Sequence, residues 1–115
     1  MTVEEIVKET IEYYKTHKRA VNAYGYCYYI TKEGDMCAAG RCQIMTDESM
    51  LGSVIHIPNF ERTLKEQYRG HSVRFWRELQ GLHDRSKHWV ENDKGGSDLT
   101  HEGRLFAESI MNDFS

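Results

Sequence analysis

The sequence predicts one α+β domain, in which a small antiparallel sheet of two or three strands packs against three or four helices. Two patterns lead to this prediction. Apolar residues recur at helical spacing near both ends of the chain, whereas the middle contains short aromatic-rich runs between glycine-containing turns. The length of 115 residues is that of a single domain. Residues 1–115 are therefore expected to share one hydrophobic core.

The first element is predicted to be a helix that begins after Thr2. Thr2 and Glu5 have the spacing of a capping box, in which each side chain bonds to the backbone N–H of the other residue. Buried-type residues then recur every three or four positions: Val3, Ile6, Val7, Thr10, Ile11 and Tyr14. This spacing predicts that the helix buries one face.

The sheet is predicted in the middle of the chain. Residues 25–30 are rich in tyrosine, which favours a strand. Residues 32–34 can form a hairpin loop with Gly34 at positive φ, and residues 36–39 would be the returning strand. Residues 53–57 are a candidate third strand, which Pro58 would end.

Two helices are predicted after Pro58, and a third near the end of the chain. Asn59 can cap a helix that runs to residue 69, where Gly70 is placed to end it. Ser72 begins another helix, which His83 or Asp84 ends. Residues 92–98 are predicted to be a loop. The apolar positions assigned to the last two helices are Phe75 or Trp76, Leu79 and Leu82, and then Leu99, Phe106, Ile110 and Phe114.

Three cysteines lie within sixteen positions, at Cys27, Cys37 and Cys42. In the predicted hairpin, Cys27 and Cys37 are diagonal neighbours with Cβ atoms about 7 Å apart, whereas a disulfide needs about 4 Å. Their spacing lacks the close pair that introduces most structural zinc sites. Arg41 beside Cys42 is the local hint of an activated thiol. We interpret the cysteines as free packing residues, with a metal site or a catalytic thiol as alternatives.

The composition is that of an ordinary folded protein, with 39% hydrophobic and 29% charged residues and a net charge of −3. No apolar run has the length of a membrane span. The amino-terminal stretch is acidic and amphipathic, unlike a secretory signal, and the odd cysteine count indicates reduced thiols. These features predict a cytoplasmic protein.

The charge is unevenly distributed. Residues 62–87 carry seven basic and three acidic side chains, whereas residues 88–115 carry two basic and six acidic ones. A local positive charge favours contact with an anionic partner, although two solvated helical faces are the plainer interpretation. The candidate partner-binding residues in the basic stretch are Tyr68, Arg69, Arg74, Trp76 and Arg77.

His83, Asp84 and His88 are the candidates for a metal or catalytic centre. His83 and His88 are five residues apart, whereas a helical zinc pair has a spacing of four. The structural alternative is that His83 or Asp84 closes a helix while Trp89 fills the core. We predict the structural role, and we predict no catalytic residue, no bound metal and no cofactor.

Several short motifs occur in a characteristic order along the chain. They are Arg19-Ala20-Val21, Gly25-x-Cys27-x-Tyr29, Glu33-Gly34, Cys37-Ala38-Ala39-Gly40, Asp47-Glu48 and Leu79-Gln80-x-x-His83-Asp84. This succession resembles a group of small, mostly uncharacterised proteins of tailed bacteriophages and prophages. Residues 41–43 depart from that pattern, and residues 50–71 have no counterpart in it. The resemblance implies a phage accessory protein that acts in the cytoplasm of a bacterial host, and it carries no catalytic residue with it.

Three functions are then compatible with the sequence. The first is a non-enzymatic binder or inhibitor of a host or phage macromolecule, for example a defence or replication protein. The second is a module that binds a nucleotide or nucleic acid through the basic helices of residues 62–87. The third is a small metal-dependent hydrolase or nuclease that uses His83 and Asp84. We predict the first.

Overall fold

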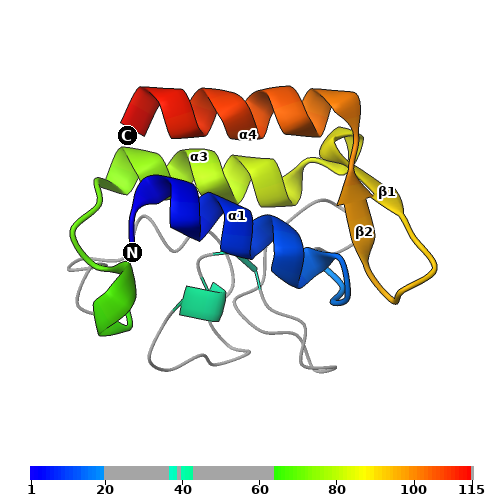
Figure 1. The fold of residues 1–115 in the computed structure, drawn as a ribbon, viewed down its shortest axis with the longest axis horizontal. Coiled ribbons are helices and arrows are strands. Elements are labelled where there is room, and N and C mark those ends of the chain that lie inside the picture. Colours follow the sequence, from blue (N-terminus) through cyan, green and yellow to red (C-terminus); the bar gives the residue numbers. More distant parts are fainter. Residues whose placement is uncertain (20–36, 39, 43–63, 115) are drawn as a thin grey trace.

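The computed structural model describes residues 1–19, 37–38, 40–42 and 64–114. Within them, three α-helices accompany one two-stranded antiparallel sheet, so the predicted α+β class is confirmed (Figure 1). The helices are α1 (Val3–Tyr14), α3 (Val73–Asp84) and α4 (His101–Phe114), and the strands are β1 (Trp89–Glu91) and β2 (Ser97–Leu99). Short 3₁₀ turns are η1 (Gly40–Cys42), η3 (Glu66–Tyr68) and η4 (Ser86–His88).

Helix α1 begins with the predicted capping box. The Thr2 N–H donates to Glu5 Oε1 at 2.9 Å, and the Glu5 N–H donates to Thr2 Oγ1 at 3.1 Å. These bonds satisfy two of the backbone groups that the first turn of a helix leaves without partners. The buried residues of α1 are Val3, Ile6, Val7, Thr10 and Tyr14, as the periodicity predicts.

Helix α3 also begins and ends where the sequence predicts. Ser72 is its N-cap, and its Oγ accepts a hydrogen bond from the Phe75 N–H at 3.1 Å. The helix ends at Asp84, after which the backbone is extended at Arg85. Its buried stripe contains both aromatic candidates and both leucines: Phe75, Trp76, Leu79 and Leu82.

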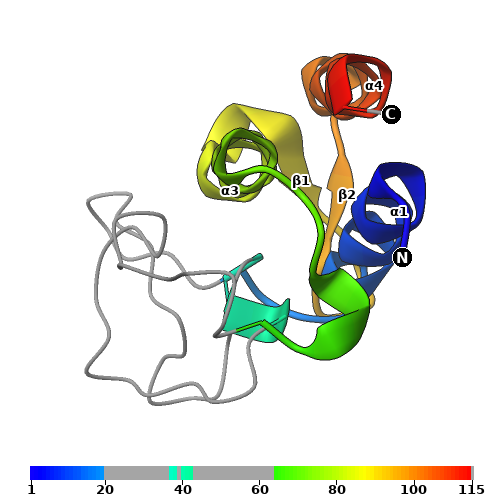
Figure 2. The same cartoon turned by 90° about the vertical axis from the view of Figure 1, so that its left-hand side faces the viewer.

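Helix α4 lies along α3 and α1, and the end-on view shows the three helices grouped around a shared interior (Figure 2). At one end, the Phe75 and Phe114 rings meet edge to face, with centroids 5.8 Å apart. At the other end, α4 crosses η4 so closely that a Cβ on Gly103 would lie 2.3 Å from the His88 carbonyl oxygen. The absence of a side chain at Gly103 therefore sets the distance at which α4 packs.

Strands β1 and β2 pair in the register Trp89↔Leu99, Val90↔Asp98 and Glu91↔Ser97. The sequence predicts a loop over residues 92–98 and assigns Leu99 to the last helix. Both predictions are wrong at β2, to which Ser97, Asp98 and Leu99 belong, whereas α4 begins at His101. Each strand has three residues, too few to show an alternation of apolar and polar positions. The hairpin is therefore identified by the hydrogen-bonded pairing of its strands and not by a sequence pattern.

Two other predictions are wrong where the structure describes the chain. Cys37 and Ala38 are not in a strand, because the Arg41 N–H donates to the Cys37 carbonyl and turns the chain into η1. The predicted helix of residues 59–69 is not helical at Leu64 and Lys65, because the Lys65 N–H bonds to the Cys42 carbonyl of another segment. The other predicted strands, and the start of that helix, lie outside the described residues.

The buried apolar side chains of the described residues form one cluster to which all three helices contribute. Trp76, Tyr14 and Phe75 are its largest members. None of the helices in this part of the chain has the length and apolar character needed to cross a bilayer.

Two glycines allow a test of the helix packing. Gly103→Ala places a methyl group against the His88 carbonyl and is expected to lower the free energy of unfolding by about 1–3 kcal/mol. Gly81→Ala is the matched control, because the nearest atom to its new Cβ is the Phe106 ring at 3.8 Å. Inside a helix, the change from glycine to alanine is expected to raise the free energy of unfolding by about 0.5–1 kcal/mol. Urea unfolding of both variants measures the difference, and a neutral Gly103→Ala variant would contradict the close crossing.

Candidate functional site

The described cysteines are buried and free of disulfides, as predicted for Cys37 and Cys42. Cys27 lies outside the described residues. Burial raises the pKa of Cys42 to about 12, although the neighbouring Arg41 acts to lower it. Cys42 is therefore a neutral thiol at physiological pH, and its Sγ donates to the Ala38 carbonyl at 3.5 Å. This geometry supports a packing role and does not activate a nucleophile.

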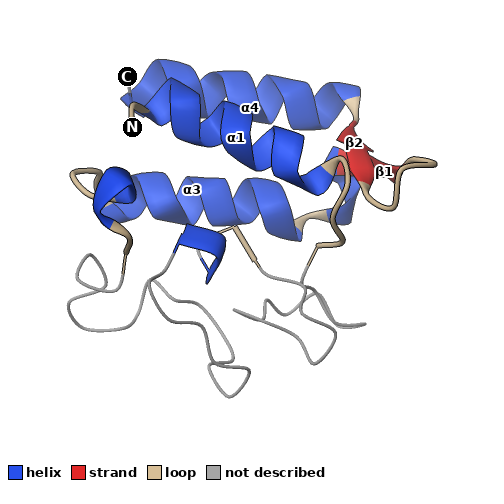
Figure 3. Ribbon diagram, turned by 60° about the horizontal axis from the view of Figure 1, so that its bottom comes forward, coloured by secondary structure: helices blue, strands red, loops and turns tan. Residues whose placement is uncertain are grey.

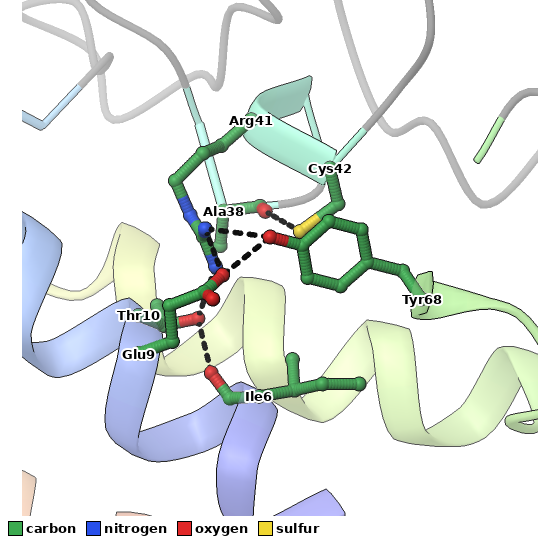
Figure 4. Close-up of polar contacts among 7 residues, drawn as sticks. All are labelled: Ile6, Glu9, Thr10, Ala38, Arg41, Cys42 and Tyr68. Atoms are coloured by element: carbon green, nitrogen blue, oxygen red, sulfur yellow. Dashed lines mark hydrogen bonds and ion pairs between the residues drawn. The ribbon is translucent and has the colours of Figure 1, made fainter. Parts of the chain in front are cut away.

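Next to Cys42, the Arg41 side chain enters the core and is only 8% exposed. Figure 4 shows its guanidinium between α1 and η3. It donates to Glu9 Oε1 at 2.5 Å, to Thr10 Oγ1 at 2.9 Å and to the Tyr68 hydroxyl at 3.3 Å. The Tyr68 hydroxyl also donates to Glu9. We call Glu9, Thr10, Arg41 and Tyr68 the Arg41 cluster.

The charges of the Arg41 cluster stabilise one another. Burial acts to raise the pKa of Glu9, but its hydrogen bonds from Tyr68 and Arg41 outweigh this and lower the pKa. Burial acts to lower the pKa of Arg41, but Cys42 and Glu9 outweigh it and raise the pKa. Burial and the bond to Glu9 raise the pKa of Tyr68 to about 12. The cluster therefore holds a carboxylate, a guanidinium and a neutral phenol, an arrangement suited to joining segments rather than to exchanging protons.

His83 and Asp84 lie together at the end of α3. The His83 ring is fully buried, and its Nδ1 donates to Asp84 Oδ1 at 2.6 Å. The Gln80 side chain donates to the same oxygen at 2.8 Å. Burial lowers the pKa of His83, although Asp84 acts to raise it. His83 is therefore a neutral imidazole whose contacts hold it in the core.

His88 does not join this pair. Its Nδ1 donates to the Leu82 carbonyl at 3.1 Å, and the Trp89 indole Nε1 donates to the same carbonyl at 2.8 Å. Trp89 is buried, in agreement with its predicted place in the core. Within residues 1–19, 37–38, 40–42 and 64–114, no three His, Cys, Asp or Glu side chains converge in a way that could hold a metal ion.

An open cleft of about 600 Å³ lies beside this end of α3. It is formed between the segment that follows α1 and the β1–β2 hairpin, which lie close together at one end of the molecule (Figure 3). We call it the hairpin cleft. Neither His83 nor Asp84 lines it. Among the described residues, its lining consists of Lys18, Arg19, Ser86, Trp89, Glu91, Asn92, Gly95, Gly96 and Ser97.

Arg19 connects the hairpin cleft to the end of α3. Its Nη1 donates to the His83 carbonyl at 2.7 Å, and its guanidinium carbon lies 5.9 Å from the centre of the Trp89 ring. Burial lowers the pKa of Arg19, while Asp84 and Tyr14 act to raise it. The sequence names Arg19 only as part of the Arg19-Ala20-Val21 motif and gives no signal of these contacts, because its partners are 64 and 70 positions away along the chain.

The opposite wall of the cleft is anchored to α1. The Asn92 Nδ2 donates to the Lys15 carbonyl at 2.9 Å, and its Oδ1 accepts hydrogen bonds from the Lys94 and Gly96 N–H groups. Gly96 packs against the end of α1, where a Cβ would lie 2.2 Å from the Tyr14 carbonyl oxygen. The hairpin loop is therefore held in one position relative to Lys18 and Arg19.

The predicted partner-binding residues divide into two groups. Arg69, Arg74 and Arg77 are exposed. Trp76 and Tyr68 are only 1% and 5% exposed and belong to the core, so their rings do not form the aromatic surface that the prediction implied. They are buried because Trp76 lies on the inner stripe of α3 and Tyr68 bonds to Glu9 and Arg41 within the Arg41 cluster.

Comparison of the chain with protein-family models, with curated proteins and with solved structures finds no match in any of the three. The likeness to phage proteins therefore stays a prediction. The features that bear on function are the Arg41 cluster, the His83–Asp84 pair, the hairpin cleft and the exposed arginines.

The contacts of the Arg41 cluster predict that the loss of Arg41 destabilises the protein. Arg41→Met removes a buried charge from three partners. We expect the free energy of unfolding to fall by about 2–3 kcal/mol. This is less than for a fully buried ion pair, because Glu9 is partly exposed and can regain water. Lys8→Met is the control, since its pair with Glu4 is exposed on both sides, and it should change stability by less than about 0.5 kcal/mol. Equal effects in urea unfolding would show that the cluster contributes little.

The burial of His83 predicts how the stability of the protein depends on pH. Its pKa is lowered in the folded state, so the unfolded chain takes up the proton first as the pH falls. Stability should therefore be complete above about pH 6.5 and decrease below it, by at most about 1.4 kcal/mol per pH unit. The His83→Gln variant should lose this part of the dependence between pH 7.5 and 5.5, whereas the exposed His101→Gln control should keep it. Identical slopes in all three proteins would rule out His83 as the source.

Proposed function

We propose that this chain is a non-enzymatic binding protein that holds a host or phage macromolecule through the outer face of α3. The motif succession that resembles tailed-phage accessory proteins supports a place of action in a bacterial host cytoplasm. The observation that carries the proposal is the contrast between reactive groups that are bound internally and arginines that face outward.

Three candidate reactive side chains of the described residues, Cys42, Tyr68 and His83, are already engaged. Cys42 is a neutral, buried thiol, and Tyr68 has a raised pKa. His83 is fully buried and bonded to Asp84, which also accepts from Gln80. A general base or nucleophile must instead reach the substrate atom on which it acts. This arrangement favours binding over the hydrolase or nuclease alternative at His83 and Asp84.

The outward-facing arginines have the chemistry of a docking surface. Arg74 and Arg77 lie one turn apart on α3 and are exposed. Arg74 stacks over the Phe114 ring at 5.8 Å, which holds its guanidinium at the surface. Within the described part of the chain, neither residue forms an ion pair. Arginine is well suited to carboxylates and phosphates because its planar group donates two parallel hydrogen bonds. An acidic protein surface is therefore the proposed partner.

Charge reversal tests this surface. The Arg74→Glu/Arg77→Glu variant should lose a partner that the parent protein retains when it is immobilised in bacterial lysate, with bound proteins identified by mass spectrometry. The control is Lys8→Glu/Arg104→Glu, which reverses two exposed cations on α1 and α4. Circular dichroism establishes that both variants are folded. Retention of the partner by the α3 variant, or its loss from both variants, would contradict the proposed surface.

The nucleic-acid alternative rests on the same exposed arginines and can be separated from the first. Contacts to phosphates release counterions, so affinity for an oligonucleotide falls steeply with salt. Fluorescence anisotropy with single- and double-stranded oligonucleotides at two salt concentrations makes the comparison. Saturable binding that Arg74→Glu/Arg77→Glu abolishes would favour the nucleic-acid module. An absence of binding up to about 100 µM, the weak end of non-specific affinities, would exclude it.

A further inference from the structure

We propose that the hairpin cleft binds a small molecule through a phosphate group, with Arg19 and Lys18 as its cationic residues. This site is separate from the outer face of α3, so it does not depend on the function proposed above. Four properties of the cleft support this: a half-buried guanidinium that has no ion-pair partner among the described residues, a second cation beside it, a volume larger than the anion, and walls held by hydrogen bonds and close contacts.

Arg19 is the central residue. Its guanidinium is half-buried against the Trp89 ring, and one of its N–H groups is used by the His83 carbonyl. A guanidinium has five N–H donors in a planar fork. Among the described residues, no carboxylate lies within ion-pair distance of it. A half-buried cation with unused N–H donors and no nearby carboxylate is stabilised by an anion that enters from the open side of the cleft.

The two cations of the cleft favour a doubly charged anion over a singly charged one. Lys18 is exposed and adjacent to Arg19, so both cations border the same space. Asp84 acts on Arg19 from the α3 side, and Glu91 lines the cleft from β1. A phosphate monoester carries a charge of about −1.5 to −2 and three acceptor oxygens. It therefore gains more from two neighbouring cations than a single carboxylate does, and this gain opposes the repulsion from Glu91.

The volume of the cleft indicates more than a bare anion. Its roughly 600 Å³ falls within the range of small-molecule sites. Ser86 and Ser97 are also in its lining and offer hydroxyl groups. Hydroxyls of this kind can bond to those of a sugar. A phosphorylated, hydroxyl-bearing metabolite is therefore the chemical class that fits.

The walls are already in place before a ligand arrives. Asn92 bonds to the Lys15 carbonyl, and Gly96 contacts the end of α1 directly. Arg19 is held from behind by the His83 carbonyl. Little conformational entropy then has to be lost on binding, which favours affinity for a small ligand.

Isothermal titration calorimetry at constant ionic strength tests the proposal with inorganic phosphate, ribose 5-phosphate, ribose and acetate as probes. Ribose 5-phosphate should bind saturably and more tightly than inorganic phosphate, whereas ribose and acetate should not bind. Arg19→Gln should weaken ribose 5-phosphate binding at least tenfold and Lys18→Gln about threefold, because charged hydrogen bonds contribute more than a nearby exposed charge. Arg104→Gln is the matched control and should bind as the parent does.

The Arg19→Gln variant also removes the bond to the His83 carbonyl and could therefore fail to fold. Two further variants test the proposal without this change. Arg19→Lys keeps the charge and should retain part of the affinity, and Lys18→Gln alters a side chain on the surface. Failure of both phosphate probes to bind saturably at millimolar concentration would overturn the proposal. Binding that is unchanged in the folded Arg19 and Lys18 variants would place the anion elsewhere and overturn it as well. Acetate binding equal to that of phosphate would show that the site does not select phosphate.

Discussion

The last turn of α3 is the constraint on which much of the described structure depends. Helices end with carbonyl oxygens that lack intrahelical partners. Here the Leu82 carbonyl accepts from both the His88 ring and the Trp89 indole, and the His83 carbonyl accepts from Arg19. Three side chains from outside the helix therefore end it and fix the chain on both sides. The negative end of the helix dipole also favours the cation at this position.

This constraint explains why the hairpin and the end of α1 lie beside each other. Trp89 is the first residue of β1, and its indole bond to Leu82 sets where the strand starts. The paired strand β2 then leads into α4, whose close crossing at Gly103 brings it against His88. From the other direction, Arg19 holds the segment after α1 against the same turn. The hairpin cleft is the space that these attachments leave between them.

The Arg41 cluster has the corresponding role at Glu9 and Thr10 of α1. A buried guanidinium is costly unless its charge and its hydrogen bonds are satisfied. Glu9, Thr10 and Tyr68 supply this compensation for the two terminal nitrogens of Arg41 from two elements, which joins η1 and η3 to α1. The two arginines thus differ in a way that bears on function. Among the described residues, Arg41 has a carboxylate partner, whereas Arg19 contacts a carbonyl and an aromatic face and lines the cleft.

Sequence reasoning correctly predicted those features that depend on neighbours in the chain. The capping box at Thr2 and Glu5, the cap at Ser72 and the inner stripe of α3 all follow from spacing, because a helix repeats its contacts every three or four residues. The α+β class and the buried state of Cys37 and Cys42 were predictable on similar grounds. The prediction for the ending of α3 was also right, although the reason involves residues beyond the helix.

Tertiary structure alone decided the sites. Strands of three residues are too short to show a periodic sequence pattern. Strands β1 and β2 are therefore recognised only from their pairing in the folded structure, for example Trp89 with Leu99. Tyr68 and Trp76 were named as candidate partner-binding residues, yet packing buries both of them. Arg41 and Glu9 are 32 positions apart, and Arg19 and His83 are 64 apart. Local sequence determines helices because their hydrogen bonds are local, but whether a charge is buried, paired or left open depends on groups that only the folded chain brings within reach.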